Sequence, residues 1–165
     1  MKDEEKIKSL VFFQANCFKS HRSLGFNIDN ANAIFGIIIE MRNIVVAAEN
    51  QDTILLHKHM GLCSQSLSDY ATINSIKLSD VLPNNSHEKM TERTQGLDLE
   101  FYLEKIKDDL SFVKDMSDDE KIEFIQKTWV CIFPEDYHDD FIKVDRILKK
   151  TIEDNKIKYP KAFFN

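Results

Sequence analysis

The sequence predicts an all-α protein, a single-domain bundle of about six or seven helices. Apolar residues recur at three- and four-residue steps along most of the chain, as they do on the buried face of a helix. The 165 residues include only four Gly and three Pro, which interrupt helices, and twelve Phe, which suit a core of large side chains. No pair of alternating segments joined by turn residues predicts a β-hairpin. A single domain of this length, residues 1–165, removes roughly 70 % of its unfolded surface from water.

The first two helices are predicted by apolar periodicity and by one capping signal. The first is expected from Glu4 to about Ser20, and a second from about Ala31 to Ala48, where Asp29 or Asn30 can accept the first amide hydrogen bonds. Apolar residues cover most of the circumference of the second helix, so we expect it to be the central, most buried element. The inward stripe of the first helix contains Ile7, Leu10, Val11, Phe13 or Gln14, Cys17 and Phe18.

The middle of the chain contains the strongest turn signals. Asn50-Gln51-Asp52 indicates either a kink or a new cap for a segment from Thr53 to Met60. Gly61 then stands where a left-handed residue would end that segment. A third helix is expected from about Ser64 to Ile76. The sequence Pro83-Asn84-Asn85-Ser86-His87 predicts an exposed loop over residues 83–90.

The second half of the chain predicts three more helices. One is expected from Leu97 to Met116, after Gly96. Ser117 to Glu120 has the sequence of a capping box, so the next helix begins there and ends at Phe133, before Pro134. Its inward residues are Ile122, Ile125, Trp129 and Ile132. Pro134 suits the first turn of a last helix from Glu135 to about Ile157, followed by a C-terminal tail, residues 158–165.

Cysteine usage and the N-terminus predict a cytoplasmic protein. Cys17, Cys63 and Cys131 are widely spaced and form no CxxC pair, so zinc and thioredoxin-like sites are not indicated. Three unpaired thiols suit a reducing compartment, where each is expected to be a buried structural residue. The first six residues lack the basic-then-apolar order of a signal peptide. The most apolar run, Ile34 to Ala48, is interrupted by polar residues and is too short to span a bilayer.

The histidines offer a metal site that the sequence does not support well. His57 and His59 are two residues apart on a helix and point about 200° apart, so they cannot bind one metal together. His57 or His59 with His138-Asp139 and Asp145 matches the order of ligands in the helical HD metallohydrolases. However, some eighty residues separate His57 from His138, and only 25 follow Asp140. With no nucleophile or phosphate-binding motif either, we expect no catalytic or metal residues, no cofactor and no enzyme activity.

Charge is the most unusual property of the chain. Residues 98–140 contain 14 Asp/Glu and five Lys, a net charge of −9, while the whole chain carries −6 and the remainder therefore +3. Helix dipoles explain acids in first turns, namely Asp118, Asp119, Glu120, Glu135 and Asp136. They do not explain Asp108, Asp109, Asp115, Asp139 and Asp140. Two interpretations remain open: a solvated face that serves solubility, and a binding face that repels nucleic acid and anionic lipid and attracts a basic partner.

The acidic runs Asp115–Glu120 and Glu135–Asp140, the Lys/Asn/Ile-rich composition and the absence of a catalytic motif resemble the immunity proteins of bacterial contact-dependent growth inhibition systems. That resemblance implies a toxin inhibitor that binds one cognate toxin, often a basic nuclease, and blocks its active site or substrate surface. It implies no direct contact with nucleic acid or membrane. The interface is then expected to include Asp115, Asp118, Asp119, Glu120, Glu123, Glu135, Asp136, Tyr137, Asp139 and Asp140.

Two alternatives belong to other classes. One is an HD-like metal-dependent hydrolase that uses His57 or His59, His138 and Asp139. The other is a scaffold or regulatory protein that binds a partner helix through a Phe-rich surface. The terminal Phe163 and Phe164 either form a docking patch, which would suit this second alternative, or are tucked into the bundle, as we expect.

Overall fold

The computed structural model describes residues 2–23, 29–82, 104, 116–138 and 141–164, and it confirms the all-α fold class. Within these residues there is no β-strand, and five helices of 15 to 21 residues are joined by three short helices of four or five. In chain order they are α1 (Asp3–Ser23), α2 (Asn30–Glu49), α3 (Thr53–Ile73), α4 (Leu78–Val81), α7 (Asp118–Ile132), α8 (Glu135–His138), α9 (Ile142–Lys158) and α10 (Pro160–Phe164). The predicted loop 83–90 and most of the predicted helix Leu97–Met116 lie outside the described residues.

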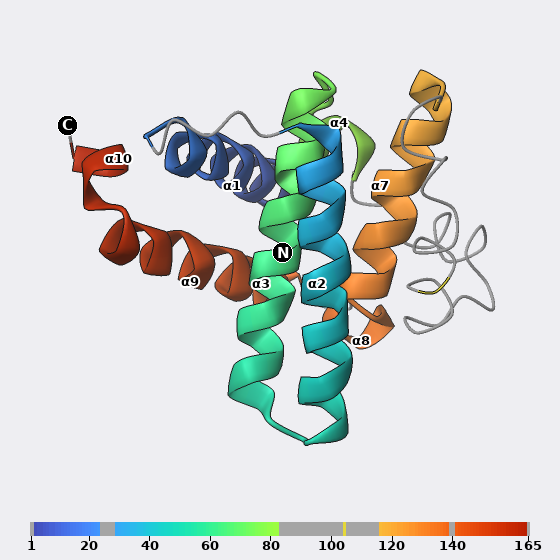
Figure 1. The fold of residues 1–165 in the computed structure, drawn as a ribbon, viewed down its shortest axis with the longest axis vertical. Helices are drawn as coiled ribbons and strands as arrows, with labels where there is room; N and C mark the ends of the chain where they lie inside the picture. Colours follow the sequence, from blue (N-terminus) through green and yellow to red (C-terminus); the bar gives the residue numbers. More distant parts are fainter. Residues whose placement is uncertain (1, 24–28, 83–103, 105–115, 139–140, 165) are drawn as a thin grey trace.

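Helices α2 and α3 form a long antiparallel hairpin (Figure 1), and each begins at a capping Asp, which decides between the alternatives that the sequence left open. The Asp29 side chain accepts a hydrogen bond from the Asn32 amide at 2.8 Å, and Asp52 accepts one from Leu55 at 3.1 Å. The turn between them is tight because Gln51 adopts a left-handed backbone conformation, with φ of 53°. Asn50-Gln51-Asp52 therefore separates two helices and does not kink one.

The predicted end of a helix at Gly61 is wrong, because α3 continues through it to Ile73. Gly61 is buried where α3 crosses α9. A β-carbon at this position would overlap the Thr151 hydroxyl and lie 3.2 Å from the Thr151 β-carbon. The glycine is thus required by the close approach of two helices rather than by a left-handed cap.

The prediction that α2 is the most buried helix is also wrong, because α3 is the central element. It packs against α1, α2, α7 and α9. Small side chains along α3 let these neighbours approach it closely; the Ser64 hydroxyl, for example, donates to the Met60 carbonyl at 2.8 Å and so can be buried. The buried residues of α3 are Met60, Gly61, Cys63, Ser64, Leu67, Ser68, Asp69, Tyr70 and Ala71.

Helices α1 and α9 lie side by side and run in the same direction, from the middle of the molecule outward (Figure 1). Ser9 of α1 donates to Asp145 Oδ1 at 2.5 Å, and Lys149 contacts the second carboxylate oxygen at 2.8 Å.

The predicted single helix from Glu135 to Ile157 is wrong, since it is divided into α8 and α9 with Phe141 as a buried turn residue between them. Asp139-Asp140 precedes this turn in sequence, and Asp favours helix starts over helix interiors.

Only part of the inward stripe predicted for α1 is buried. Leu10, Phe13 and Cys17 are buried, whereas Val11 and Phe18 are 52 % and 49 % exposed. Gln14 is also used inside the bundle: its amide nitrogen donates to the Ile76 carbonyl, and its oxygen accepts from the Leu78 amide, both at 2.8 Å. One side chain of α1 thereby joins the end of α3 to the start of α4.

By length and composition alone, α2 could cross a membrane. The helix has 20 residues, more than the run considered from the sequence, and its best 18-residue window has a mean hydropathy of 1.5. A third of that window is buried inside the bundle. Core helices of soluble proteins and signal sequences pass the same test. Three large apolar residues of α2, Phe35, Ile39 and Val46, are about half exposed.

Helix α7 begins with the predicted capping box. The Ser117 hydroxyl accepts from the Glu120 amide at 3.3 Å, and Glu120 accepts from the Ser117 amide at 3.2 Å. We expect Ser117→Ala to lower the free energy of unfolding by about 1 kcal/mol, because an amide of the first turn loses its acceptor. Urea melts measure this effect. Ser117→Asp, which retains an acceptor, serves as the control, and an unchanged midpoint in the alanine variant would contradict the role of the cap.

Candidate protein-binding surface

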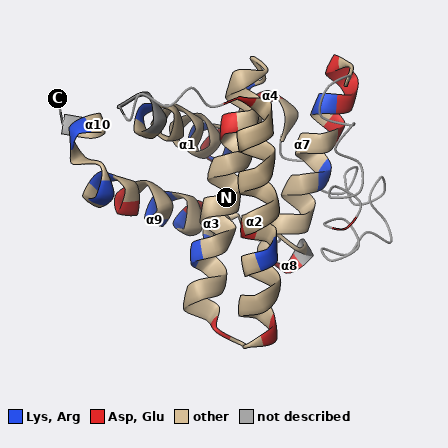
Figure 2. Ribbon diagram, in the orientation of Figure 1, with Lys and Arg blue, Asp and Glu red and all other residues tan. Residues whose placement is uncertain are grey.

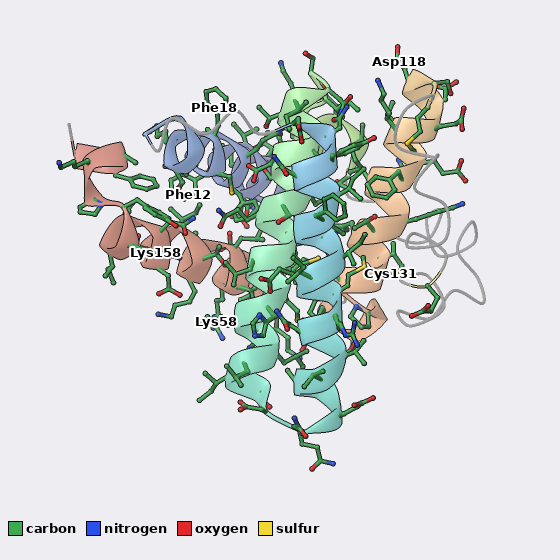
Figure 3. The ribbon with its side chains drawn as sticks, viewed as in Figure 1. Phe12, Phe18, Lys58, Asp118, Cys131 and Lys158 are labelled. Atoms are coloured by element: carbon green, nitrogen blue, oxygen red, sulfur yellow. The ribbon has the colours of Figure 1, made fainter. Side chains whose placement is uncertain are left out.

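Four carboxylates gather at the N-terminal end of α7: Asp118, Asp119, Glu120 and Glu123, here called the acidic tip. All four residues are exposed, and the Asp118 side chain is 98 % exposed (Figure 3). Lys121 lies 3.9 Å from Asp118, and Lys127 pairs with Glu123 at 2.8 Å. Because the first three stand in the first turn, they stabilise the helix through its dipole while facing solvent.

The second acidic group lies on α8, at the other end of α7. Asp136 is exposed, whereas Tyr137 is half-buried and packs against the core. The side chains of Glu135 and His138, and residues Asp115, Asp139 and Asp140, lie outside what the structure describes. From the rise of an α-helix, the 15 residues of α7 hold its two ends about 20 Å apart. The acidic tip and Asp136 are therefore separate and do not form one continuous patch.

Tyr137 brings α8 against α3 through His57, 80 residues earlier in the chain. Its hydroxyl lies 3.2 Å from His57 Nε2, and Lys143 Nζ lies 5.7 Å from the centre of its ring. Burial and the Lys143 charge lower the pKa of His57. Burial, with a contribution from Asp136, raises the pKa of Tyr137. Both shifts favour neutral side chains, so this contact is a hydrogen bond between uncharged groups near neutral pH.

His59 faces a different helix, which confirms the prediction that the two histidines point apart. Its Nδ1 lies 2.7 Å from Glu40 Oε2 on α2, and both side chains are less than one-fifth exposed. Asp145, the downstream acid of the HD-like alternative, is held by Ser9 and Lys149 in the α1–α9 contact. In the part of the chain that the structure describes, no group of three His, Cys, Asp or Glu residues is placed to hold a metal ion.

The sequence predicts that all three cysteines are buried structural residues, and two of them are fully buried. Cys17 and Cys63 are fully buried, and burial raises the pKa of each thiol well above its usual value. A thiol in that state is a poor nucleophile near neutral pH. Cys131 on α7 is half-buried (Figure 3).

Helices α9 and α10 carry many of the described cations, although Lys121 and Lys127 lie on α7 beside the acidic tip. Figure 2 shows mostly Lys and Arg along α9 and α10, while Asp and Glu, with Lys among them, stand toward the N-terminal end of α7. Several of these cations are already engaged: Lys150 binds Asp154 at 2.8 Å, and Lys156 binds Glu153 at 3.2 Å. Phe163 of α10 is partly buried against the core, as expected of a tucked C-terminus, and the Phe164 side chain lies outside the described residues.

The exposed apolar face of α2 is a feature that the sequence analysis missed. Phe35, Ile39 and Val46 are 50 %, 58 % and 49 % exposed. The apolar circumference of α2 was the available signal, but burial is the usual explanation of such a pattern. No protein-family model, curated protein or solved structure matches this chain.

Proposed function

We propose that this chain is a cytoplasmic immunity protein that binds and neutralises a basic toxin, with the acidic tip of α7 as part of the binding surface. The observation that supports it most directly is the exposure of Asp118, Asp119 and Glu120 in the first turn of α7. The strong acidic excess of residues 98–140 supports the same partner chemistry. A toxin that cleaves RNA or DNA must present positive charge to phosphates, and carboxylates compete for that surface.

The physical contribution of such a tip is mainly to association. Complementary potentials steer two proteins together and accelerate encounter, whereas exposed charges add little to the stability of the complex once formed. Lys121 and Lys127 on α7 offset part of this charge, since they lie 3.9 Å from Asp118 and 2.8 Å from Glu123, but the acids of the first turn still outnumber the cations beside them. The tip therefore suits rapid capture of a basic protein.

The test is the double variant Asp118→Lys/Asp119→Lys. We expect this variant to associate about tenfold more slowly with the product of the neighbouring gene, tested as the candidate toxin, because steering depends on local charge. We expect dissociation to change much less. The matched control is Asp3→Lys/Glu4→Lys, which makes the same charge change in the first turn of α1 and should bind like the wild type. Surface-plasmon kinetics at two salt concentrations measure both rates.

Two results would contradict the proposal. Equal association rates for the two double variants would show that the tip is not part of the interface. Binding of the wild type that is independent of salt would show that charge does not drive the encounter, since screened interactions weaken as ionic strength rises.

A further inference from the structure

A line of exposed residues runs along α2: Phe35, Ile39, Arg42 and Val46, here called the outer stripe. They are separated by four, three and four residues, and this spacing places them on one face of the helix. The opposite face is used by the bundle, where Ile34, Ile37, Met41 and Ile44 are buried. In Figure 1 no described helix lies in front of α2. Three large apolar side chains thus remain half-exposed on a helix whose other face is core.

Arg42 is the only charge in the outer stripe, and it stands near the middle. It is exposed and is the single Lys or Arg of α2 (Figure 2). The nearest acid in sequence, Glu40, is committed to His59 at 2.7 Å and lies 3.5 Å from the Asn43 amide nitrogen. Within the described residues no ion pair includes Arg42, so a docked partner would meet an available guanidinium among apolar side chains.

The position of Arg42 selects the kind of partner. A second copy related by a two-fold axis would bring two outer stripes together with both Arg42 side chains near the axis, and like charges there oppose association. A lipid surface favours helices whose cations lie on the polar face and whose embedded face is uncharged. A heterologous helix with one carboxylate in its apolar face avoids both penalties, since the carboxylate can form a bidentate pair with the guanidinium.

We propose that the outer stripe of α2 is a docking site for an amphipathic partner helix that carries an Asp or Glu within its apolar face. Steps of four and three are those by which packed helices interdigitate their side chains. The stripe spans about 17 Å, or three helical turns, which is the length of an ordinary helix-in-groove contact. This site is independent of the acidic tip, which lies on α7 and has the opposite charge.

The probe is a labelled helical peptide of about 20 residues, long enough to be helical on its own, with Leu at steps of four and three and one Glu among them. A second peptide has Lys in place of that Glu. Fluorescence anisotropy with the full chain should show that the Glu peptide binds at least several-fold more tightly than the Lys peptide. Arg42→Glu should invert this preference, and Ile39→Ser should weaken both peptides about tenfold.

Three controls make the result decisive. Arg146→Glu makes the same charge change at an exposed position of α9 and should leave the preference unchanged. Asp118→Lys/Asp119→Lys should also leave it unchanged, which separates this site from the proposed toxin surface. The helical signal in circular dichroism must be retained in each variant. Equal binding of both peptides, binding unaffected by Ile39→Ser, or dimerisation or vesicle binding that depends on Ile39 would overturn the proposal.

Discussion

Gly61→Ala should lower the free energy of unfolding by about 2 kcal/mol or more, although Ala is favoured over Gly in a helix by about 1 kcal/mol. The added β-carbon would overlap the Thr151 hydroxyl, lie 3.2 Å from the Thr151 β-carbon and lie 3.5 Å from Ile147 Cγ2. These atoms belong to α9, so relief of the overlap requires the two helices to separate. The substitution therefore disturbs the crossing on which α9 depends.

Rotation of Thr151 does not relieve the overlap easily. A β-branched residue in a helix has two γ atoms and few allowed rotamers, so moving the hydroxyl brings the methyl group toward the same space. The hydroxyl also donates to the Ile147 carbonyl at 3.0 Å, and the residue is only 6 % exposed. Adjustment of the backbone is the remaining route, and a packed interior resists it.

Urea melts of the single and double variants test this prediction. Gly61→Ala/Thr151→Ala should recover much of the lost stability, because the hydroxyl and methyl groups are gone and only the β-carbon remains close. Gly36→Ala is the matched control: its added carbon meets Ser66, whose single hydroxyl can rotate away, so its cost should be smaller. Strict additivity of Gly61→Ala and Thr151→Ala would contradict the proposed contact, since contacting residues are coupled.

The same crossing shows which parts of the fold can be predicted from the sequence. Capping signals are local: the sequence predicts the cap at Ser117 outright, limits the cap of α2 to Asp29 or Asn30, and offers Asn50-Gln51-Asp52 as either a cap or a kink. The central position of α3 was not predicted, because its burial depends on small residues such as Gly61 and Ser64 that look like turn or surface residues in a sequence. Hydrophobic periodicity identifies the apolar face of a helix. It does not identify the positions where a small residue lets two helices approach closely.

Some features of the candidate surfaces can likewise be predicted from the sequence, and others cannot. Exposure of the acids at the start of α7 follows from sequence, since charged first-turn residues face solvent. The contact of His57 with Tyr137 does not, because it joins residues 80 positions apart through the arrangement of α3 and α8. The outer stripe of α2 was missed for a related reason: an apolar helix has more than one face, and only the tertiary structure decides which face is covered.

The second large effect is expected for Trp129→Ala, at about 3–5 kcal/mol. Trp129 is 2 % exposed, and its ring lies 4.7 Å from that of Phe133, which lies 6.2 Å from Tyr137. Through the contact of Tyr137 with His57, this row of rings connects α7, α8 and α3. Loss of the indole therefore leaves a cavity and removes the support that positions α8.

Two quantities are measured: the urea midpoint of unfolding, and the pKa of His57 from an NMR titration of its ring. Trp129→Ala should lower the midpoint strongly and move the His57 pKa upward toward its usual value, because α8 no longer shields the ring. Trp129→Phe retains part of the packing and should show smaller changes in both quantities. Phe18→Ala, at a ring that is 49 % exposed, is the surface control and should alter neither by much. A normal His57 pKa in the wild type, or one that Trp129→Ala leaves unchanged, would contradict the connection between the aromatic row and α8.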